Sequence, residues 1–250
     1  MMEQKFQIEG RNPVIEALSS GENIEKIYIQ KGNTQGSAQK IINLARKKKI
    51  QVTEVDKNKL NMMAETDSHQ GVIALISPIE YVTVDYILKR AEKKGEQPFI
   101  VILDEIEDPH NLGSIIRSAN AFGAHGVIIP KHRSASVTAT VAKTSAGACF
   151  YTPVAKVTNL VNTMKELKKA GVWISGADMG GEKDIYSADL TGPVAIVIGN
   201  EGTGISRLVR EECDFIVNIP MVGEIESLNA SVSASIFMYK ISELRGKGVK

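Results

Sequence analysis

The feature that most constrains the fold is a run of five uncharged residues, Val194–Ile198, followed directly by the glycine-rich segment Gly199–Gly204. An apolar run bounded by glycine is typical of a strand buried on both faces, as in a parallel sheet. A buried strand, a glycine-rich turn and the start of a helix form the arrangement at which α/β proteins bind nucleotides. The segment therefore predicts an α/β fold in which a ligand loop follows this strand.

The composition of the loop argues against a phosphate ligand. No lysine followed by serine or threonine comes after the glycines, and the spacing of Gly199, Gly202 and Gly204 differs from the dinucleotide fingerprint. The carboxylate of Glu201, within the loop, would repel a phosphate. Taken alone, the loop leaves two interpretations equally open. It either binds a neutral or cationic nucleoside-like ligand or forms an ordinary tight turn.

Strand and helix patterns alternate along the rest of the chain, which favours a mostly parallel sheet with helices on both faces. The sequence Ser77-Pro78 interrupts this alternation. We therefore expect a small N-terminal α/β domain at residues 1–77, a linker with the first helix of the second domain at 78–95, and a larger α/β domain at 96–250.

Helix-capping residues predict where three helices begin. Asn12, Asn111 and Ser227 each precede a helical pattern and are side chains that favour N-caps. The last of these helices is expected at 228–244 and is rich in small residues, which would let another backbone approach closely. A strand is expected at 150–154.

Composition limits the class of protein. Basic and acidic residues nearly cancel, 30 against 29, so affinity for nucleic acid has to come from local patches. The two cysteines indicate a reducing compartment, and no segment is apolar enough to span a bilayer, so we expect a cytoplasmic protein without membrane contact. The histidines lack metal-ligand spacing, and the acidic segment 104–108 is interpreted as a solvated loop, so no metal site is expected.

The predicted helix at 111–122 carries one cation, Arg117, away from its apolar stripe. The small residues Gly113 and Ala121 lie one turn away on either side and leave room for a ligand to approach the guanidinium. An arginine extended into water is the more common arrangement. Because a solvated arginine does not need small neighbours, the pattern favours a functional role.

Three stretches together resemble the signature motifs of the SpoU, or TrmH-type, ribose 2′-O-methyltransferases of the SPOUT class. They are residues 111–119, residues 198–202, and residues 219–221 with 227–231. Residues 10–14 and 69–72 resemble the small substrate-binding domain of that family. The resemblance is greatest to two-domain members that methylate a guanosine ribose in large-subunit ribosomal RNA.

The resemblance implies a sheet with a trefoil knot, S-adenosylmethionine as cofactor, and a homodimer with the site near its interface. The cofactor loops correspond to residues 175–180, 199–204 and 219–228. Catalytic and substrate positions correspond to Asn111, Arg117, Glu201, Ser227 and Asn229. Cofactor positions correspond to Gly176, Gly199, Asn200, Gly202, Ile219, Met221 and Leu228.

Physical chemistry agrees with this resemblance, because S-adenosylmethionine is a cation without phosphate. We hypothesise that Arg117 binds the phosphate next to the target ribose and stabilises the developing alkoxide, with Glu201 or Asn111 holding it in place. RNA contacts are expected from the N-terminal domain, from 131–133 and from 89–94. Two alternatives remain, the same reaction on transfer RNA and a non-catalytic RNA-binding module. A nicotinamide-dependent oxidoreductase would need the dinucleotide fingerprint that is missing here.

Overall fold

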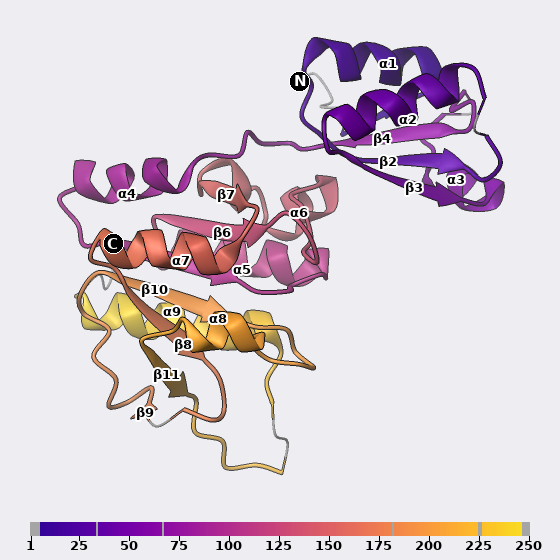
Figure 1. Cartoon of the computed structure of the whole chain (residues 1–250). Helices are drawn as coiled ribbons and strands as arrows, with labels where there is room; N and C mark the ends of the chain where they lie inside the picture. The colour runs from indigo at the N-terminus through magenta and orange to yellow at the C-terminus, as the bar shows by residue number, and fades with distance from the viewer. Residues whose placement is uncertain (1–5, 34, 67, 182, 225–226, 247–250) are drawn as a thin grey trace. The chain divides into compact units, whose positions relative to one another are not determined.

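The structure is a computed structural model that describes residues 6–33, 35–66, 68–181, 183–224 and 227–246. The chain divides into two compact units, residues 1–80 and residues 81–250 (Figure 1). The sequence-based expectations for the first five residues, and for residues 225 and 226 of the third cofactor loop, lie outside the described residues.

The N-terminal unit is a four-stranded mixed sheet with helices on both faces. Its elements are β1 (Gln7–Glu9), α1 (Arg11–Ser20), β2 (Ile24–Gln30), α2 (Ser37–Lys47), β3 (Gln51–Val55), α3 (Lys57–Met63) and β4 (Val72–Ile76). The strand order is β1-β4-β2-β3, with β2 parallel to β3 and antiparallel to β4. Helices α1 and α2 cover one face around Val14, Ile27 and Ile41, and α3 covers the other around Leu60. This small domain therefore has a core of its own.

The second unit contains the predicted parallel sheet. Its strands are β5 (Phe99–Leu103), β6 (Gly126–Pro130), β7 (Val154–Val157), β8 (Trp173–Ala177), β9 (Lys183–Asp184), β10 (Val194–Ile198) and β11 (Phe215–Asn218). Its helices are α4 (Val84–Lys93), α5 (Pro109–Ala121), α6 (Ala139–Thr144), α7 (Leu160–Lys169), α8 (Arg207–Glu211), α9 (Ala230–Leu244) and the 3-10 turn η1 (Ala148–Phe150). Within the described residues the seven strands lie in the order β7-β6-β5-β10-β8-β11-β9, and all neighbouring strands pair in parallel.

Helices cover both faces of this sheet, as the alternating pattern predicts (Figure 1). Ile87 of α4, Met164 of α7 and Val209 of α8 share one core cluster with side chains of β5, β6, β8 and β10. Helices α5 and α9 pack against each other and against the sheet. All five residues of β10 are buried, which confirms that the apolar run forms a strand covered on both faces.

The strand order places the glycine-rich loop Gly199–Gly204 at a crevice. Strand β10 lies between β5 and β8, and Ile198 is in register with Leu103 on one side and Ala177 on the other. The chain leaves β5 toward β6 on one side of β10 and returns as β8 on the other. Ligands of open α/β sheets bind where the strand order reverses in this way, beyond the carboxyl ends of the strands. The trefoil knot implied by the resemblance stays a prediction.

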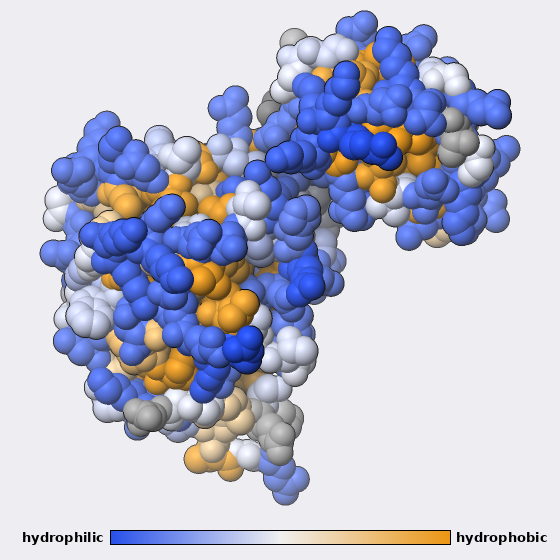
Figure 2. Space-filling view, viewed as in Figure 1, coloured by the Kyte–Doolittle hydropathy of each residue, from blue (hydrophilic) through white to orange (hydrophobic). Residues whose placement is uncertain are grey.

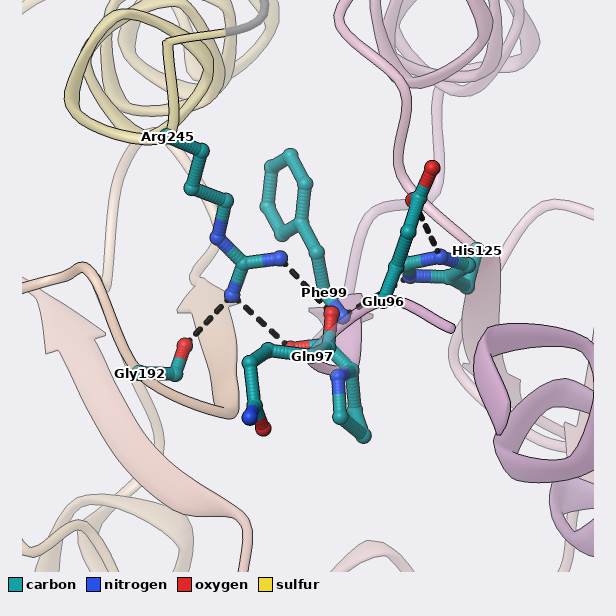
Figure 3. A network of polar contacts seen from close by, with 7 residues as sticks. Glu96, Gln97, Phe99, His125, Gly192 and Arg245 are labelled. Atoms are coloured by element: carbon teal, nitrogen blue, oxygen red, sulfur yellow. Dashed lines mark hydrogen bonds and ion pairs between the residues drawn. The ribbon is translucent and has the colours of Figure 1, made fainter. Parts of the chain in front are cut away.

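A network of polar contacts at the amino ends of β5 and β10 anchors the end of α9 (Figure 3). Arg245 donates hydrogen bonds to the carbonyl oxygens of Gln97, Pro98 and Gly192, and its guanidinium lies 5.4 Å from the centre of the Phe99 ring. Burial lowers the pKa of Arg245. His125 accepts from the amide of Phe99 at 3.0 Å and contacts Glu96. These contacts fix α9 at its carboxyl end, far along the helix from its first residue, Ala230.

One predicted helix cap and one predicted strand differ from the structure here, and two short strands were missed. Helix α1 begins at Arg11 after Gly10, whose φ of 93° allows the sharp entry, so Asn12 lies inside the first turn instead of capping it. The strand expected at 150–154 is a 3-10 turn followed by β7, because residues after Gly147 form turn hydrogen bonds up to Thr152. The short strands β1 and β9 were not predicted, since runs of three and two residues carry too little pattern.

Candidate active site

A cavity of about 380 Å³ lies beyond the carboxyl ends of β8, β10 and β11. The three loops that the resemblance assigned to the cofactor all contribute to its wall, together with the first turns of α9. The residues around it are Ala177, Asp178, Met179, Ile198, Gly199, Asn200, Glu201, Gly202, Thr203, Gly204, Ile219, Met221, Ser227, Leu228, Ala230, Ser233 and Phe237. The topology thus joins segments that are far apart in the sequence into one site.

The loop after β10 is held by its own contacts. Asn200 and Gly204 exchange backbone hydrogen bonds of 3.0 and 2.9 Å, and the Asn200 side chain donates to the carbonyl of Glu105 at 3.0 Å. A Cβ atom at Gly199 would overlap the backbone of Gly204 and Ile205. Glycine is therefore required at position 199 because the loop folds back onto it, in addition to any approach of a ligand.

Glu201 is the centre of a hydrogen-bond network that joins this loop to two helices. Its Oε1 accepts from Asn111 Nδ2 at 2.9 Å, from the Ala230 amide at 3.1 Å and from Asn229 Nδ2. Asn229 Nδ2 also donates to Asn111 Oδ1 at 2.9 Å. The network fixes the starts of α5 and α9 against the wall of the cavity.

Helix capping explains why these two asparagine amides reach Glu201. Asp108, and not Asn111 as predicted, caps α5 by accepting from the His110 amide at 2.9 Å. Asn229, and not Ser227, caps α9 with its Oδ1, which leaves its Nδ2 free to donate to Glu201. Asn111 lies in the first turn of α5, where its side chain can turn toward the β10 loop. Contacts with distant parts of the chain therefore decided which of the neighbouring residues caps each helix.

Asp178, directly after β8, lies within the predicted cofactor loop 175–180 but was not singled out as a site residue. Its Oδ1 lies 2.7 Å from Arg210 Nη1 and accepts from the Gly180 amide at 3.0 Å. Arg210 also donates to the Gly180 carbonyl at 3.2 Å, which ties the β8 loop to α8. The rule that carboxyl ends of parallel strands share one edge would have found Asp178, because it follows a predicted strand.

The charge of the cavity is one-sided. Glu201 and Asp178 contribute carboxylates, of which Asp178 also pairs with Arg210, and no lysine, arginine or histidine lines the cavity among the described residues. A carboxylate disfavours an anionic ligand and favours a cationic one. The site is therefore suited to a ligand with positive charge and without phosphate, as the loop composition predicts.

Most of the predicted cofactor positions line the cavity, but Gly176 does not. A side chain at Gly176 would meet those of Ile216, Cys213 and Ile205, so this glycine allows these three side chains to pack directly against β8. Ser227 lines the cavity, whereas Asn111 and Asn229 reach it through Glu201. The described residues thus bring together all predicted site positions except Gly176 and Arg117.

Arg117 is exposed on α5 and makes no hydrogen bond or ion pair with another described residue. Within one chain neither Glu201 nor Asn111 contacts Arg117, and the two bond to each other at 2.9 Å, so the hypothesis that one of them holds Arg117 stays a prediction. The room expected beside Gly113 is also absent, since Thr144 of α6 packs directly against it. Within one chain, Arg117 therefore lies outside the cavity.

The acidic segment 104–108 is more ordered than a solvated loop. Asp104 is buried and its Oδ2 accepts from the Ser206 amide at 2.7 Å, while Glu105 pairs with Arg133 at 2.9 Å. Across the part of the chain that the structure describes, no group of three or more histidine, cysteine or acidic side chains is placed to hold a metal ion. In the same residues no helix combines the length and apolarity needed to cross a membrane.

Two family models match the chain, one on each unit. The SpoU rRNA Methylase family matches residues 98–239, and a family described as RNA 2′-O ribose methyltransferase substrate binding matches residues 7–82. YacO of Bacillus subtilis, assigned to the TrmH family of tRNA/rRNA methyltransferases, is 47% identical over 245 residues that span 98% of both chains. A TrmH family relative from Staphylococcus haemolyticus is 48% identical over 95% of both chains.

Solved structures agree with these sequence matches. The SpoU methyltransferase AviRb from Streptomyces viridochromogenes, in complex with AdoMet, is 28% identical with a TM-score of 0.62 and covers 97% of this chain and 91% of its own. The A. aeolicus TrmH/SpoU tRNA modifying enzyme is 26% identical with a TM-score of 0.56 and covers 64% of this chain and 85% of its own. With the α/β fold, the cavity and both family matches in place, the chain belongs to the SpoU/TrmH family of RNA methyltransferases, within the SPOUT class.

Proposed function

We propose that this methyltransferase acts on the ribose 2′-hydroxyl of a guanosine in large-subunit ribosomal RNA, as a homodimer. Its methyl donor is S-adenosylmethionine, and RNA 2′-O-methyl transfer is the reaction supported by the family matches and the AdoMet complex of AviRb. The nucleotide, the class of RNA and the dimer are the parts that this proposal adds.

The observation that carries the reaction on which this proposal rests is the charge of the cavity. S-adenosylmethionine has a sulfonium cation, an amino group and no phosphate. The cavity offers the carboxylates of Glu201 and of Asp178, which also pairs with Arg210, and no lysine, arginine or histidine lines it among the described residues. Gly199, Gly202 and Gly204 keep the wall free of side chains, so that backbone can contact a nucleoside. The residues present therefore fit this cofactor.

The side chains of this chain have two tasks in the reaction. When bound, S-adenosylmethionine supplies an electrophilic methyl group for an in-line displacement, in which alignment provides much of the acceleration. Glu201, Asn111 and Asn229 hold the loop, α5 and α9 in one arrangement and so fix the wall. Arg117 binds the RNA phosphate beside the target ribose and stabilises the developing negative charge on the 2′ oxygen, because a guanidinium stays protonated and cannot serve as the base.

The homodimer is supported by the surface that α5 and α9 share. Tyr239 is 58% exposed and Val232 is 45% exposed, and the Tyr239 ring lies edge-on to Phe122 at 5.8 Å. Arg117 lies on α5, whose C-cap is Phe122, and outside the cavity of its own chain. A second copy of the chain bound to this surface would cover the aromatic side chains. Arg117 of one copy could then reach the active site of the other.

Ribosomal RNA is favoured over transfer RNA by the extent of the chain. The family model that matches residues 98–239 is described as the SpoU rRNA Methylase family, whereas the A. aeolicus TrmH/SpoU tRNA modifying enzyme covers only 64% of this chain. A separate N-terminal unit adds contact area for a target within a large folded RNA. The same reaction on transfer RNA is the second candidate, because the TrmH family relatives are assigned to both RNA classes.

The test is to map ribose methylation across total RNA from cells with and without the gene. Loss of one guanosine 2′-O-methyl mark in large-subunit ribosomal RNA is the expected result, and purified protein should restore that mark in vitro. Loss of a mark in transfer RNA alone would replace the proposed target by the second candidate. An unchanged methylation map would contradict the enzyme's proposed role.

A further inference from the structure

We propose that Arg210 is a positioning residue that sets how strongly the cavity prefers the charged methyl donor to its uncharged product. Arg210 acts through Asp178, whose carboxylate lines the cavity. The product, S-adenosylhomocysteine, lacks the transferred methyl group and the positive charge on sulfur. The inference concerns the binding of these two ligands, so it does not depend on the class of RNA proposed above.

The two carboxylate oxygens of Asp178 have different surroundings. Oδ1 lies 2.7 Å from Arg210 Nη1 and accepts from the Gly180 amide at 3.0 Å. Oδ2 lies beside the glycine-rich loop, where a Cβ atom at Gly204 would lie 3.2 Å from it. Both contacts with described residues thus involve Oδ1, and Oδ2 remains available to the cavity.

The guanidinium of Arg210 is held against the loop after β8. Its Nη2 donates to the Gly180 carbonyl at 3.2 Å, and a Cβ atom at Gly180 would lie 3.1 Å from this nitrogen. The side chain of Arg210 is 35% exposed and that of Asp178 is 23% exposed. Because a partly buried pair is screened less than a surface pair, the guanidinium offsets part of the carboxylate charge at the cavity.

Among the described residues, Arg210 is the one cation that pairs with a carboxylate of the cavity. The other carboxylate, Glu201, receives its hydrogen bonds from two asparagine side chains and one backbone amide. These donors are uncharged, so they orient Glu201 without cancelling its charge. The net charge at the cavity therefore depends on Arg210.

This net charge matters because the reaction removes a positive charge from the ligand. The C–S bond breaks with its electron pair on sulfur as the methyl group passes to the ribose oxygen, so a sulfonium cation becomes a neutral thioether. Carboxylate charge at the cavity favours the cation over the thioether and over the transition state between them. Interactions that bind the starting state more tightly than the transition state slow a reaction. By offsetting the charge of Asp178, Arg210 limits this excess preference.

A second arginine of α8 provides a matched control. Arg207 pairs with Glu211 at 2.6 Å on the same helix, and both side chains are exposed. Figure 2 shows that hydrophilic residues cover much of the visible surface of the unit that contains α8. Among the described residues, Arg207 neither lines the cavity nor pairs with a residue that does. Its loss removes an exposed charge without changing the partner of Asp178.

Two single variants of the full chain and their combination test the proposal. Calorimetric titration with each ligand, without RNA, measures both dissociation constants, and their ratio is the preference for the donor over the product. Arg210→Ala leaves the carboxylate uncompensated, so we expect this preference to rise by about fivefold at low salt and by less at high salt. Asp178→Asn leaves the guanidinium uncompensated and should lower the preference by a similar factor. The double variant removes both charges and should return it to within about twofold of wild type.

Arg210→Lys keeps the charge and should keep the wild-type preference, although lysine cannot make both contacts of the guanidinium. We expect Arg207→Ala to bind both ligands as wild type does. Equal weakening of both ligands in Arg210→Ala, with an unchanged preference, would overturn the proposal, because Arg210 would then only tie the loop to α8. A lowered preference in that variant would overturn it as well. Failure to find the proposed RNA target would leave the proposal intact, because the titrations contain no RNA.

Discussion

At the scale of single residues, the two charged side chains emphasised by the sequence have different surroundings. Glu201 is fixed by hydrogen bonds from Asn111, Asn229 and the Ala230 amide, so its role within the chain is to hold the cavity wall. Arg117 has no such bonds to described residues and remains free to contact RNA. The role of Arg117 therefore depends on the RNA that the chain binds.

Replacing Arg117 by lysine tests the need for a planar guanidinium. Lysine keeps the positive charge but cannot form two parallel hydrogen bonds to a phosphate. We expect the methyl-transfer rate to fall by about 100-fold or more, with little change in affinity for S-adenosylmethionine. Single-turnover kinetics and cofactor titration measure the two quantities, and near-normal turnover would contradict this role.

The thiols are expected to be inert in the folded protein. Burial raises the pKa of the Cys213 thiol to about 12, and burial also raises the pKa of Cys149. Since the reactive form is the thiolate, iodoacetamide should modify neither cysteine readily at pH 8 and should modify both after unfolding in urea. Mass spectrometry of the quenched reaction checks this, and rapid labelling of native protein would disprove it.

The raised pKa of Cys213 also affects the stability of the protein at high pH. The raised pKa of Cys213 in the folded state means that its contribution to stability is complete below the unfolded value of 9.0 and is lost as the pH rises toward about 12. Thermal unfolding measured above pH 9 should therefore show lower stability than at pH 8, and Cys213→Ser should reduce that difference.

At the scale of elements, α5 connects three parts of the molecule. Four residues of its predicted apolar stripe, Leu112, Ile115, Ile116 and Ala119, are fully buried, whereas the fifth, Phe122, is half-buried beside the Tyr239 ring. Gly113 packs against α6, and Asn111 reaches the loop after β10. The position of the helix therefore sets both the packing of α6 and the shape of the cavity.

Gly113→Ala tests the packing between α5 and α6. The new methyl group would overlap Thr144 Oγ1 and lie 2.8 Å from Thr144 Cβ, which forces the two helices apart. Alanine gains helix propensity, so we expect a net loss of about 1–2 kcal/mol in the free energy of unfolding. Urea titration measures the free energy of unfolding of this variant, and Ser114→Ala is the control on the same helix. Unchanged stability of the alanine variant would show that α6 can move freely.

At the scale of the whole molecule, the proposed dimer explains an exposed aromatic surface and an arginine outside its own cavity. We expect the wild-type protein to sediment as a dimer and Tyr239→Arg to sediment as a monomer with reduced methyl transfer. Trp173→Arg is the control, because Trp173 is 59% exposed and belongs to β8, not to α5 or α9. A monomeric wild type would contradict the dimer, and equal dissociation of both variants would contradict the assigned surface.

Several features could be predicted from the sequence because their causes are local. The run Val194–Ile198 is too apolar to face water, so it forms a buried strand in any fold that accommodates it. The missing lysine and the presence of Glu201 excluded a phosphate loop before any geometry was known. Asn159 was followed by a helix in the structure for an equally local reason, since its side chain caps the first turn of α7.

Other features depended on contacts between distant segments. The sequence offers several capping residues near the starts of α5 and α9, and Asp108 and Asn229 form the caps while Asn111 turns to Glu201, 90 residues away. Asp178 entered the site only because β8 and β10 end at the same edge. Composition and pattern determined the fold class and the kind of ligand, whereas tertiary packing decided which side chains meet, because that depends on strand order and register.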